Sequence, residues 1–156
     1  MATWRCCRCP RNGHQTILAF LYRVFFAFLQ PRGGLVLFAP LRLRVSPAAF
    51  REPDLLLLLH ANDPRAQNRY WSGADLVLEV VSEDDPERDT VDKVHDYAGA
   101  GIPEYWIVNP LDETITVLSL AGDGYEPRGI FRRGEQADSA LLEGFRVSVA
   151  EVFDAS

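Results

Sequence analysis

ADLVLEVVSEDDPERDTVDKVHDY, residues 74–97, is the stretch that decides the fold. Within it residues 76–81, LVLEVV, form a continuous apolar run, which predicts a strand buried on both faces. Glu79 lies in the middle of this run. A carboxylate that has lost its water must find a cation or hydrogen-bond donors, and an apolar residue would have cost less free energy at this position. Glu79 is therefore the first candidate functional residue.

A helix is predicted directly after this strand. Asp84 or Asp85 suits the N-cap and Pro86 suits the first helical position, while glycines shortly after Ala98 mark the end. The apolar stripe that we expect to face the core consists of Val91, Val94 and Ala98.

Lys93, on this helix, is the only lysine in the chain, because fifteen of the sixteen Lys and Arg residues are Arg. Asp89, Lys93 and Tyr97 are four residues apart and share one face, so Lys93 can point back toward the strand. An ammonium is a compact point charge that suits a reacting water or a developing oxyanion. The alternative is a lysine retained by chance on a solvated face, paired with Asp89.

Length and composition predict one α/β or α+β domain, since 156 residues with 47% hydrophobic content can bury one core. The net charge of -6 is unevenly distributed. Residues 1–74 hold ten Arg against three acids, and residues 75–156 hold six Lys and Arg against nineteen acids. Such asymmetry favours a cationic face beside an acidic, metal-attracting one. The alternative is a mixed surface without functional meaning.

All three cysteines lie in the leader, at Cys6, Cys7 and Cys9. With His14 they offer four zinc ligands, but their spacing matches zinc fingers and ribbons poorly. We expect residues 1–12 to be a disordered or atypical leader, and residues 13–156 to form the single domain. No disulfide framework is indicated, which fits a reducing cytoplasm.

The apolar run ILAFLYRVFFAFL, residues 17–29, predicts a largely buried amphipathic helix from about His14 to Gln30. Thirteen residues that include Arg23 are too few to span a bilayer, and no small-residue cleavage site follows. We therefore expect no membrane association.

Short extended segments follow this helix. Residues 36–39 and 41–45 predict a strand pair or one bent strand, and residues 55–59 predict a second strand buried on both faces. Asp54 stands at the entrance of that strand, where an Asp is commonly a turn residue. Because Glu79 places a carboxylate in the other buried strand, a functional role for Asp54 is favoured instead. Later strands are predicted at about residues 104–108, 114–120 and 125–131, with a strand and a helical turn within residues 144–153.

The polar segment of residues 60–73 contains Arg65, Arg69, Tyr70 and Trp71. Arginines interleaved with aromatic residues suit a phosphate backbone and exposed bases, so Arg65 and Arg69 are candidate nucleic-acid-binding residues. The alternative is that Tyr70 and Trp71 pin the loop to the core.

Asp54, Glu79 and Lys93 together suggest a chemistry. Two carboxylates on neighbouring strands can hold Mg²⁺ (or Mn²⁺), which binds phosphate and lowers the pKa of a water. These are the requirements of phosphodiester hydrolysis.

Five ordered segments carry a resemblance to a known family: REPDLLLL (51–58), ADLVLEVVSEDDPERD (74–89), VDKVHDYAGAGIPEYWIVNP (91–110), TITVL (114–118) and LLEGFRVSVAEVF (141–153). The chain resembles the PD-(D/E)xK nucleases and, among them, the Uma-type family of bacterial restriction endonucleases. The resemblance implies a restriction-endonuclease-like core, a mixed β-sheet flanked by helices. It further implies that Asp54 and Glu79 are the catalytic, metal-binding carboxylates. The usual lysine position is Val81, and the family moves this lysine to the following helix, where Lys93 stands.

The resemblance also implies a start that is shortened relative to the family, without an early acidic segment. The leading hypothesis is a metal-dependent DNA endonuclease in which Lys93 orients the attacking water or stabilises the transition state. The alternatives are a catalytically inactive nucleic-acid-binding domain and a protein-interaction domain with the same fold. DNA is the expected partner, and a homodimer is a further hypothesis, since nucleases of this kind commonly cut both strands as dimers.

Overall fold

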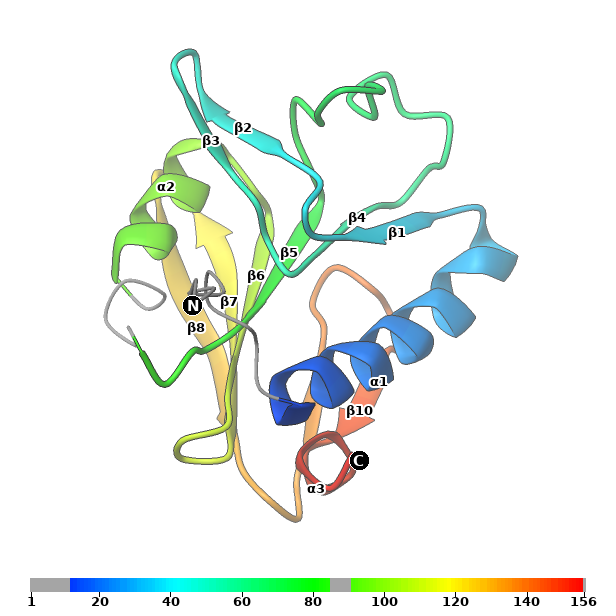
Figure 1. Ribbon diagram of the computed structural model, residues 1–156, viewed down its shortest axis with the longest axis vertical. Helices are drawn as coiled ribbons and strands as arrows, with labels where there is room; N and C mark the ends of the chain where they lie inside the picture. Colours follow the sequence, from blue (N-terminus) through cyan, green and yellow to red (C-terminus); the bar gives the residue numbers. More distant parts are fainter. Residues whose placement is uncertain (1–11, 85–90, 156) are drawn as a thin grey trace, which may run out of the picture.

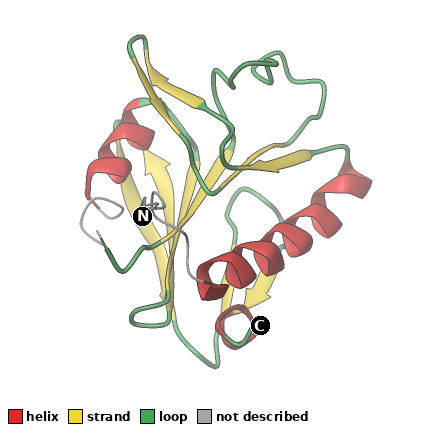
Figure 2. Cartoon of the chain, viewed as in Figure 1, coloured by secondary structure: helices red, strands yellow, loops and turns green. Residues whose placement is uncertain are grey.

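The computed structural model describes residues 12–84 and 91–155, which form a mixed sheet flanked by helices (Figures 1 and 2). The main sheet has six strands in the order β1-β4-β5-β6-β7-β8. Its strands are β1 (Leu35–Phe38), β4 (Leu55–Leu58), β5 (Leu76–Val80), β6 (Glu104–Asn109), β7 (Thr114–Ala121) and β8 (Gly124–Phe131). Among these six strands β5 and β6 form the parallel pair, because the chain crosses between them through helix α2 (Lys93–Gly99).

Side chains of the central strands alternate between two buried clusters, one on each face of the sheet. In β4, Leu55 and Leu57 belong to one cluster, and Leu56 and Leu58 belong to the other. Both faces of β4 and β5 are therefore apolar, which explains their unbroken hydrophobic sequences.

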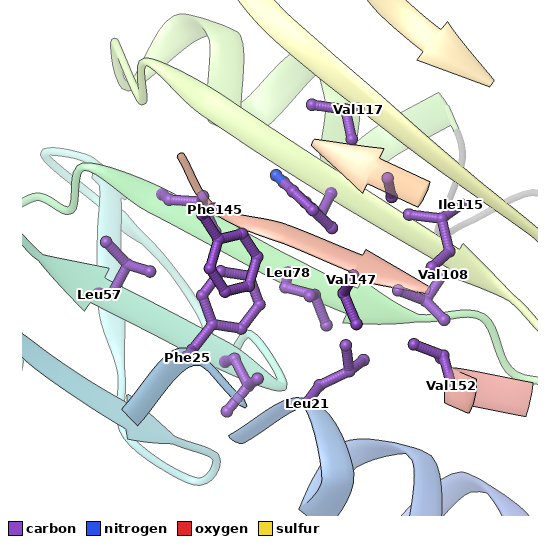
Figure 3. Close-up of a cluster of buried hydrophobic side chains, with 14 of the residues drawn as sticks. Leu21, Phe25, Leu57, Leu78, Val108, Ile115, Val117, Phe145, Val147 and Val152 are labelled. Atoms are coloured by element: carbon purple, nitrogen blue, oxygen red, sulfur yellow. The ribbon is translucent and has the colours of Figure 1, made fainter. Parts of the chain in front are cut away.

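Helix α1 (Asn12–Leu29) covers the first face together with α3 (Val149–Phe153), as Figure 1 shows. Every fourth residue of α1 from Ile17 to Leu29 is buried, which is the spacing of one helix face. Phe25 anchors the helix, with its ring stacked on that of Phe145 at a centroid distance of 4.4 Å (Figure 3). Its ring centroid also lies 5.6 Å from that of Trp106. A 3-10 turn, η1 (Gln30–Arg32), ends the helix at Gly33, whose φ is 78°. In the described part of the chain, no helix has both the length and the apolarity that crossing a membrane requires.

The second face is covered by α2 and by a hairpin of β2 (Leu43–Ser46) and β3 (Ala49–Arg51). Within the hairpin Leu43 and Val45 are buried and Arg44 is exposed, as the alternating sequence predicts. A second short pair, β9 (Gln136–Asp138) with β10 (Arg146–Ser148), packs on the α1 side. Strands β3 and β9 were not predicted, whereas the remaining strands and helices α1 and α3 agree with the sequence expectation in position.

One helix prediction is wrong. Val91 was expected in the core stripe of the second helix, but it is 64% exposed, while Val94 packs against the second cluster and Ala98 is buried. Residues 91 and 92 form a π-helical turn and α2 begins only at Lys93, which changes which side chains face inward.

Several predictions fall on residues outside the described ranges. The capping residues Asp85 and Pro86 and the lysine partner Asp89 lie there, as do the three cysteines and nearly all of the leader. The domain boundary at residue 13 stays a prediction.

Candidate active site

Glu79 is buried in β5, with 2% of its surface exposed, on the face that α2 covers. Its neighbours on that face of the strand, Val77 and Val81, belong to the second hydrophobic cluster. Helix α2 supplies the groups that meet the carboxylate. The Tyr97 hydroxyl donates a hydrogen bond of 2.6 Å to Oε1, and the Lys93 Nζ lies 3.0 Å from Oε2.

Burial raises the pKa of Glu79 to about 7, since the charged form has lost its water. The Lys93 ammonium and the Tyr97 hydroxyl act in the opposite direction, and the negative charge of Asp54 raises the pKa further. The distance between Lys93 Nζ and Glu79 Oε2 alone suggests that Glu79 is fully ionised. Loss of hydration, however, raises the pKa of Glu79 by more than the Lys93 ammonium lowers it. Burial also raises the pKa of Tyr97, so its phenol stays neutral and serves as a donor.

Asp54 stands at the start of β4, beside Glu79. Leu55 pairs with Leu78 in the antiparallel ladder. Asp54, which precedes Leu55, therefore comes opposite Glu79, which follows Leu78. The Val80 backbone N–H donates to Asp54 Oδ2 over 2.8 Å. Within residues 12–84 and 91–155 no group donates to Oδ1, which leaves this oxygen available to a ligand.

Lys93 opens α2 and keeps 18% of its side chain exposed. Tyr97 follows one helical turn later, and both side chains reach Glu79. The ammonium therefore lies at the strand and does not project into bulk solvent.

His14 is a residue of this site that the sequence reasoning did not assign to it. Its Nε2 lies 3.1 Å from the Val80 carbonyl oxygen and 3.5 Å from Asp54 Oδ2. The hydrogen bond to Asp54 raises the pKa of His14. Its Nδ1 is buried without a partner in the described part of the chain. No local spacing links residue 14 to residue 54, so only the packing of α1 against β5 brings the imidazole here.

The oxygen atoms of this site suit a small divalent cation. Asp54 and Glu79 supply carboxylates, and the Val80 carbonyl oxygen lies beside them. Among the described residues no group of three or more His, Cys, Asp or Glu side chains is arranged to hold a metal. Mg²⁺ commonly uses one or two carboxylates and completes its shell with waters and substrate phosphates, so this donor set fits it.

The two predicted nucleic-acid-binding arginines differ in their surroundings. Arg65 contacts Asp63 and Asp75 at 2.7 Å and 2.8 Å, whereas Arg69 is exposed. Trp71 is buried in the second cluster, so it does anchor this loop to the core. Tyr70 is half-buried and packs edge-on against Phe50.

Comparisons with known proteins agree with this architecture. Residues 9–150 match the model of the Uma2 family, described as "Putative restriction endonuclease". The fold is similar to the crystal structure of "a putative nuclease belonging to DUF820" from Anabaena variabilis, with a TM-score of 0.76 at 17% identity, over 94% of this chain and 83% of that chain. At such identity the likeness establishes the fold alone. The search of curated proteins gave no match.

Proposed function

This chain belongs to the Uma2 restriction endonuclease family, and from that premise we propose that it is a metal-dependent DNA endonuclease that hydrolyses phosphodiester bonds. The observation that carries the proposal is the Lys93–Glu79 contact of 3.0 Å next to Asp54. Three separate elements, β4, β5 and α2, bring these groups together. An ion pair in a buried strand is weak support for stability alone, so a functional reason for it is favoured.

Asp54 and Glu79 would hold the metal, Mg²⁺ or Mn²⁺, with the free Oδ1 of Asp54 as one ligand atom. When bound, such an ion neutralises charge on the phosphate and lowers the pKa of a water. Val80 N–H fixes the other Asp54 oxygen, and Tyr97 fixes the orientation of Glu79. Both carboxylates are thus held in place before substrate arrives.

Lys93 is the proposed third catalytic residue. Its ammonium can orient the attacking water or stabilise the extra negative charge on the phosphoryl oxygens in the transition state. A partly exposed side chain suits this role, since the group must face both Glu79 and the substrate.

The substrate proposal includes Arg69 and Arg65, the two candidate nucleic-acid-binding residues. Arg69 is exposed and free to meet a phosphate, while Arg65 is engaged with Asp63 and Asp75 and would act mainly by holding the loop. A homodimer would place one active site on each strand of the DNA duplex. Sedimentation with and without DNA tests whether the protein is a dimer.

Plasmid nicking tests the proposed function. We expect wild-type protein to nick supercoiled plasmid with Mg²⁺ or Mn²⁺ and to lose the activity with EDTA. Glu79→Gln and Lys93→Met should each slow cleavage by about 10²–10⁴-fold. Glu126→Gln is the matched control, because Glu126 is exposed on β8, and it should cleave at the wild-type rate.

Two results would contradict the proposal. Salt-sensitive DNA binding without metal-dependent cleavage would indicate a catalytically inactive nucleic-acid-binding domain. Affinity for neither DNA nor divalent metal would leave only a protein-interaction domain with this fold.

A further inference from the structure

The outer face of the β2–β3 hairpin gathers arginines and aromatic rings. Leu43 and Val45 point into the core, so the residues between and beside them point outward. Phe50 pairs with Arg44 across the hairpin and shares its side. We call this surface the hairpin face, and it consists of Arg42, Arg44, Phe50 and Tyr70, with the exposed Arg69 preceding Tyr70 in the loop.

Two of the arginines lie over aromatic rings. The guanidinium carbon of Arg42 is 4.3 Å from the centroid of the Phe50 ring, and that of Arg44 is 5.8 Å from the centroid of Tyr70. The two rings pack edge-on with their centroids 5.3 Å apart. A guanidinium stacked on a ring loses side-chain freedom but keeps its N–H edge available to an acceptor such as phosphate.

Backbone hydrogen bonds join the loop residues to the hairpin. Arg44 N–H donates to the Trp71 carbonyl over 2.9 Å, and Trp71 N–H donates to the Arg42 carbonyl over 2.8 Å. Because Trp71 is buried and bridges to Leu43, the adjacent Tyr70 is held beside β2, and the exposed Arg69 precedes it in the loop.

The arginines of the hairpin face have no carboxylate partner in the described part of the chain, as is also true of Arg23, Arg32, Arg132 and Arg146, but here they are gathered on one surface. Arg51, Arg65, Arg128 and Arg133 each form an ion pair with an Asp or a Glu. No such pair involves Arg42, Arg44 or Arg69 within residues 12–84 and 91–155, and the nearby exposed Glu52 pairs with none of them. Three uncompensated charges in a protein of net charge -6 are a local positive surface.

The hairpin face is joined to the candidate active site by very few residues. Strand β3 ends at Arg51, and only Glu52 and Pro53 separate it from Asp54. The hairpin leaves the main sheet beside β4 and β5, next to α2 (Figure 1). The hairpin that carries this surface therefore leads directly into Asp54 along the chain.

We propose that the hairpin face binds the sugar-phosphate backbone of DNA next to the phosphodiester bond that is cleaved. The inference rests on the proposed function and adds a substrate-binding surface to it. Its charge is complementary to a phosphate backbone, and guanidinium contacts to phosphates are independent of base sequence. The surface positions the duplex and leaves base recognition to other groups.

Fluorescence anisotropy with labelled duplexes tests this surface, measured in EDTA so that no cleavage occurs. The test variant is Arg42→Gln/Arg44→Gln/Arg69→Gln. The matched control is Arg23→Gln/Arg132→Gln/Arg146→Gln, which removes the same charge at exposed arginines outside the hairpin and its loop. Circular dichroism verifies that each variant is folded.

We expect the hairpin variant to raise Kd by roughly tenfold or more for two duplexes of unrelated sequence, and the control to change it little. The slope of log Kd against log salt should fall by about 3, one for each lost phosphate contact. If both variants weaken binding equally, only net charge matters and the inference is wrong. If the test variant does not fold, Arg42→Gln and Arg44→Gln are measured singly, and unchanged slopes in both would overturn the inference.

The two proposals fail in distinguishable ways. Wild-type cleavage together with unaltered binding by the hairpin variant contradicts the inference and leaves the endonuclease proposal in place. Arginine-dependent binding without any cleavage by wild-type protein supports the DNA-binding surface and contradicts the endonuclease proposal.

Discussion

Glu79 stays inside an apolar strand because α2 brings one group to each of its oxygens. Tyr97 donates to Oε1 and Lys93 lies at Oε2, so neither oxygen is left without a partner. These contacts do not fully replace water, as the pKa of about 7 shows. The residue is thus held in place but remains short of positive charge, which is the condition under which a carboxylate gains most from a bound cation.

The raised pKa of Glu79 predicts how the metal-free protein responds to pH. The unfolded chain releases this proton near pH 4.5, whereas the folded chain retains it until about pH 7. The free energy of unfolding should therefore decrease as pH rises through this window, on the order of 1.4 kcal/mol per unit of pKa difference. Glu79→Gln removes this component.

Urea denaturation of wild type and Glu79→Gln, in EDTA at pH 5 and pH 7.5, measures this pH-dependent part of the free energy of unfolding. From pH 5 to pH 7.5, the free energy of unfolding of Glu79→Gln should rise by at least about 1 kcal/mol relative to that of wild type. The raised pKa of His14 acts in the same direction in both proteins and largely cancels in the comparison. Parallel stability profiles would contradict the prediction.

At the level of single residues, sequence reasoning identified Glu79 by its cost of burial and Lys93 by its rarity. It had no means to find His14, because the contact joins residues 40 positions apart through tertiary packing. Arg65 and Arg69 are two arginines of the same loop, yet Arg65 is ion-paired and Arg69 is exposed. Composition does not distinguish such cases, since the acids that pair with an arginine are set by the folded loop.

At the level of elements, an ion pair joins the hairpin to the helix that carries Lys93. Arg51 Nε donates to Asp96 Oδ2 over 2.7 Å. Arg51 lies three residues before Asp54, and Asp96 lies between Lys93 and Tyr97 on α2. The pair thus connects the two segments that carry the proposed catalytic residues Asp54 and Lys93.

Arg51→Met and Asp96→Asn should each lower cleavage by about tenfold, because displacement of α2 moves Lys93 away from Glu79. The loss should appear in kcat and little in KM, since Arg51 points toward α2 and away from the hairpin face. A double-mutant cycle should give a coupling of about 0.5–1 kcal/mol for this half-buried pair. Arg133→Met, which breaks the exposed pair with Glu113, is the control and should leave cleavage unchanged.

The two strands missed by sequence reasoning are as short as the predicted β10, but neither is followed by a helical turn that would mark it. Strands β3 and β9 have three residues each, too few to show alternation, and they exist because β2 and β10 pair with them. The error at Val91 has a different cause. Extending the helical period backward from Ala98 assumes a continuous α-helix, and the π-helical turn breaks that phase.

For the whole molecule, Glu104 holds the two sides of the first core together. It is 1% exposed at the start of β6 and accepts four hydrogen bonds. Their donors are the Trp106 indole N–H, the Ser139 hydroxyl and the backbone N–H groups of Ala140 and Leu141. One buried carboxylate therefore fixes the segment between β9 and β10 against the main sheet.

Glu104→Ala should lower the free energy of unfolding by about 3 kcal/mol or more, because it leaves several buried donors without an acceptor. Urea denaturation measures the change, and the exposed Glu126→Gln should stay within about 0.5 kcal/mol of wild type. The remaining folded Glu104→Ala protein should still cleave, since Glu104 lies on the face opposite to Glu79. A loss below about 1 kcal/mol would show that water replaces the carboxylate.

The short connection between the hairpin and β4 has an evolutionary consequence. Side chains alternate along extended chain, so inserting or deleting one residue at Glu52 or Pro53 would turn either Asp54 or the arginines to the opposite side. Exposed Glu52 can accept many residue types without that effect. Within this segment, length is expected to be inherited more strictly than amino-acid identity, and alignment gaps should fall in the loop of residues 60–70 instead.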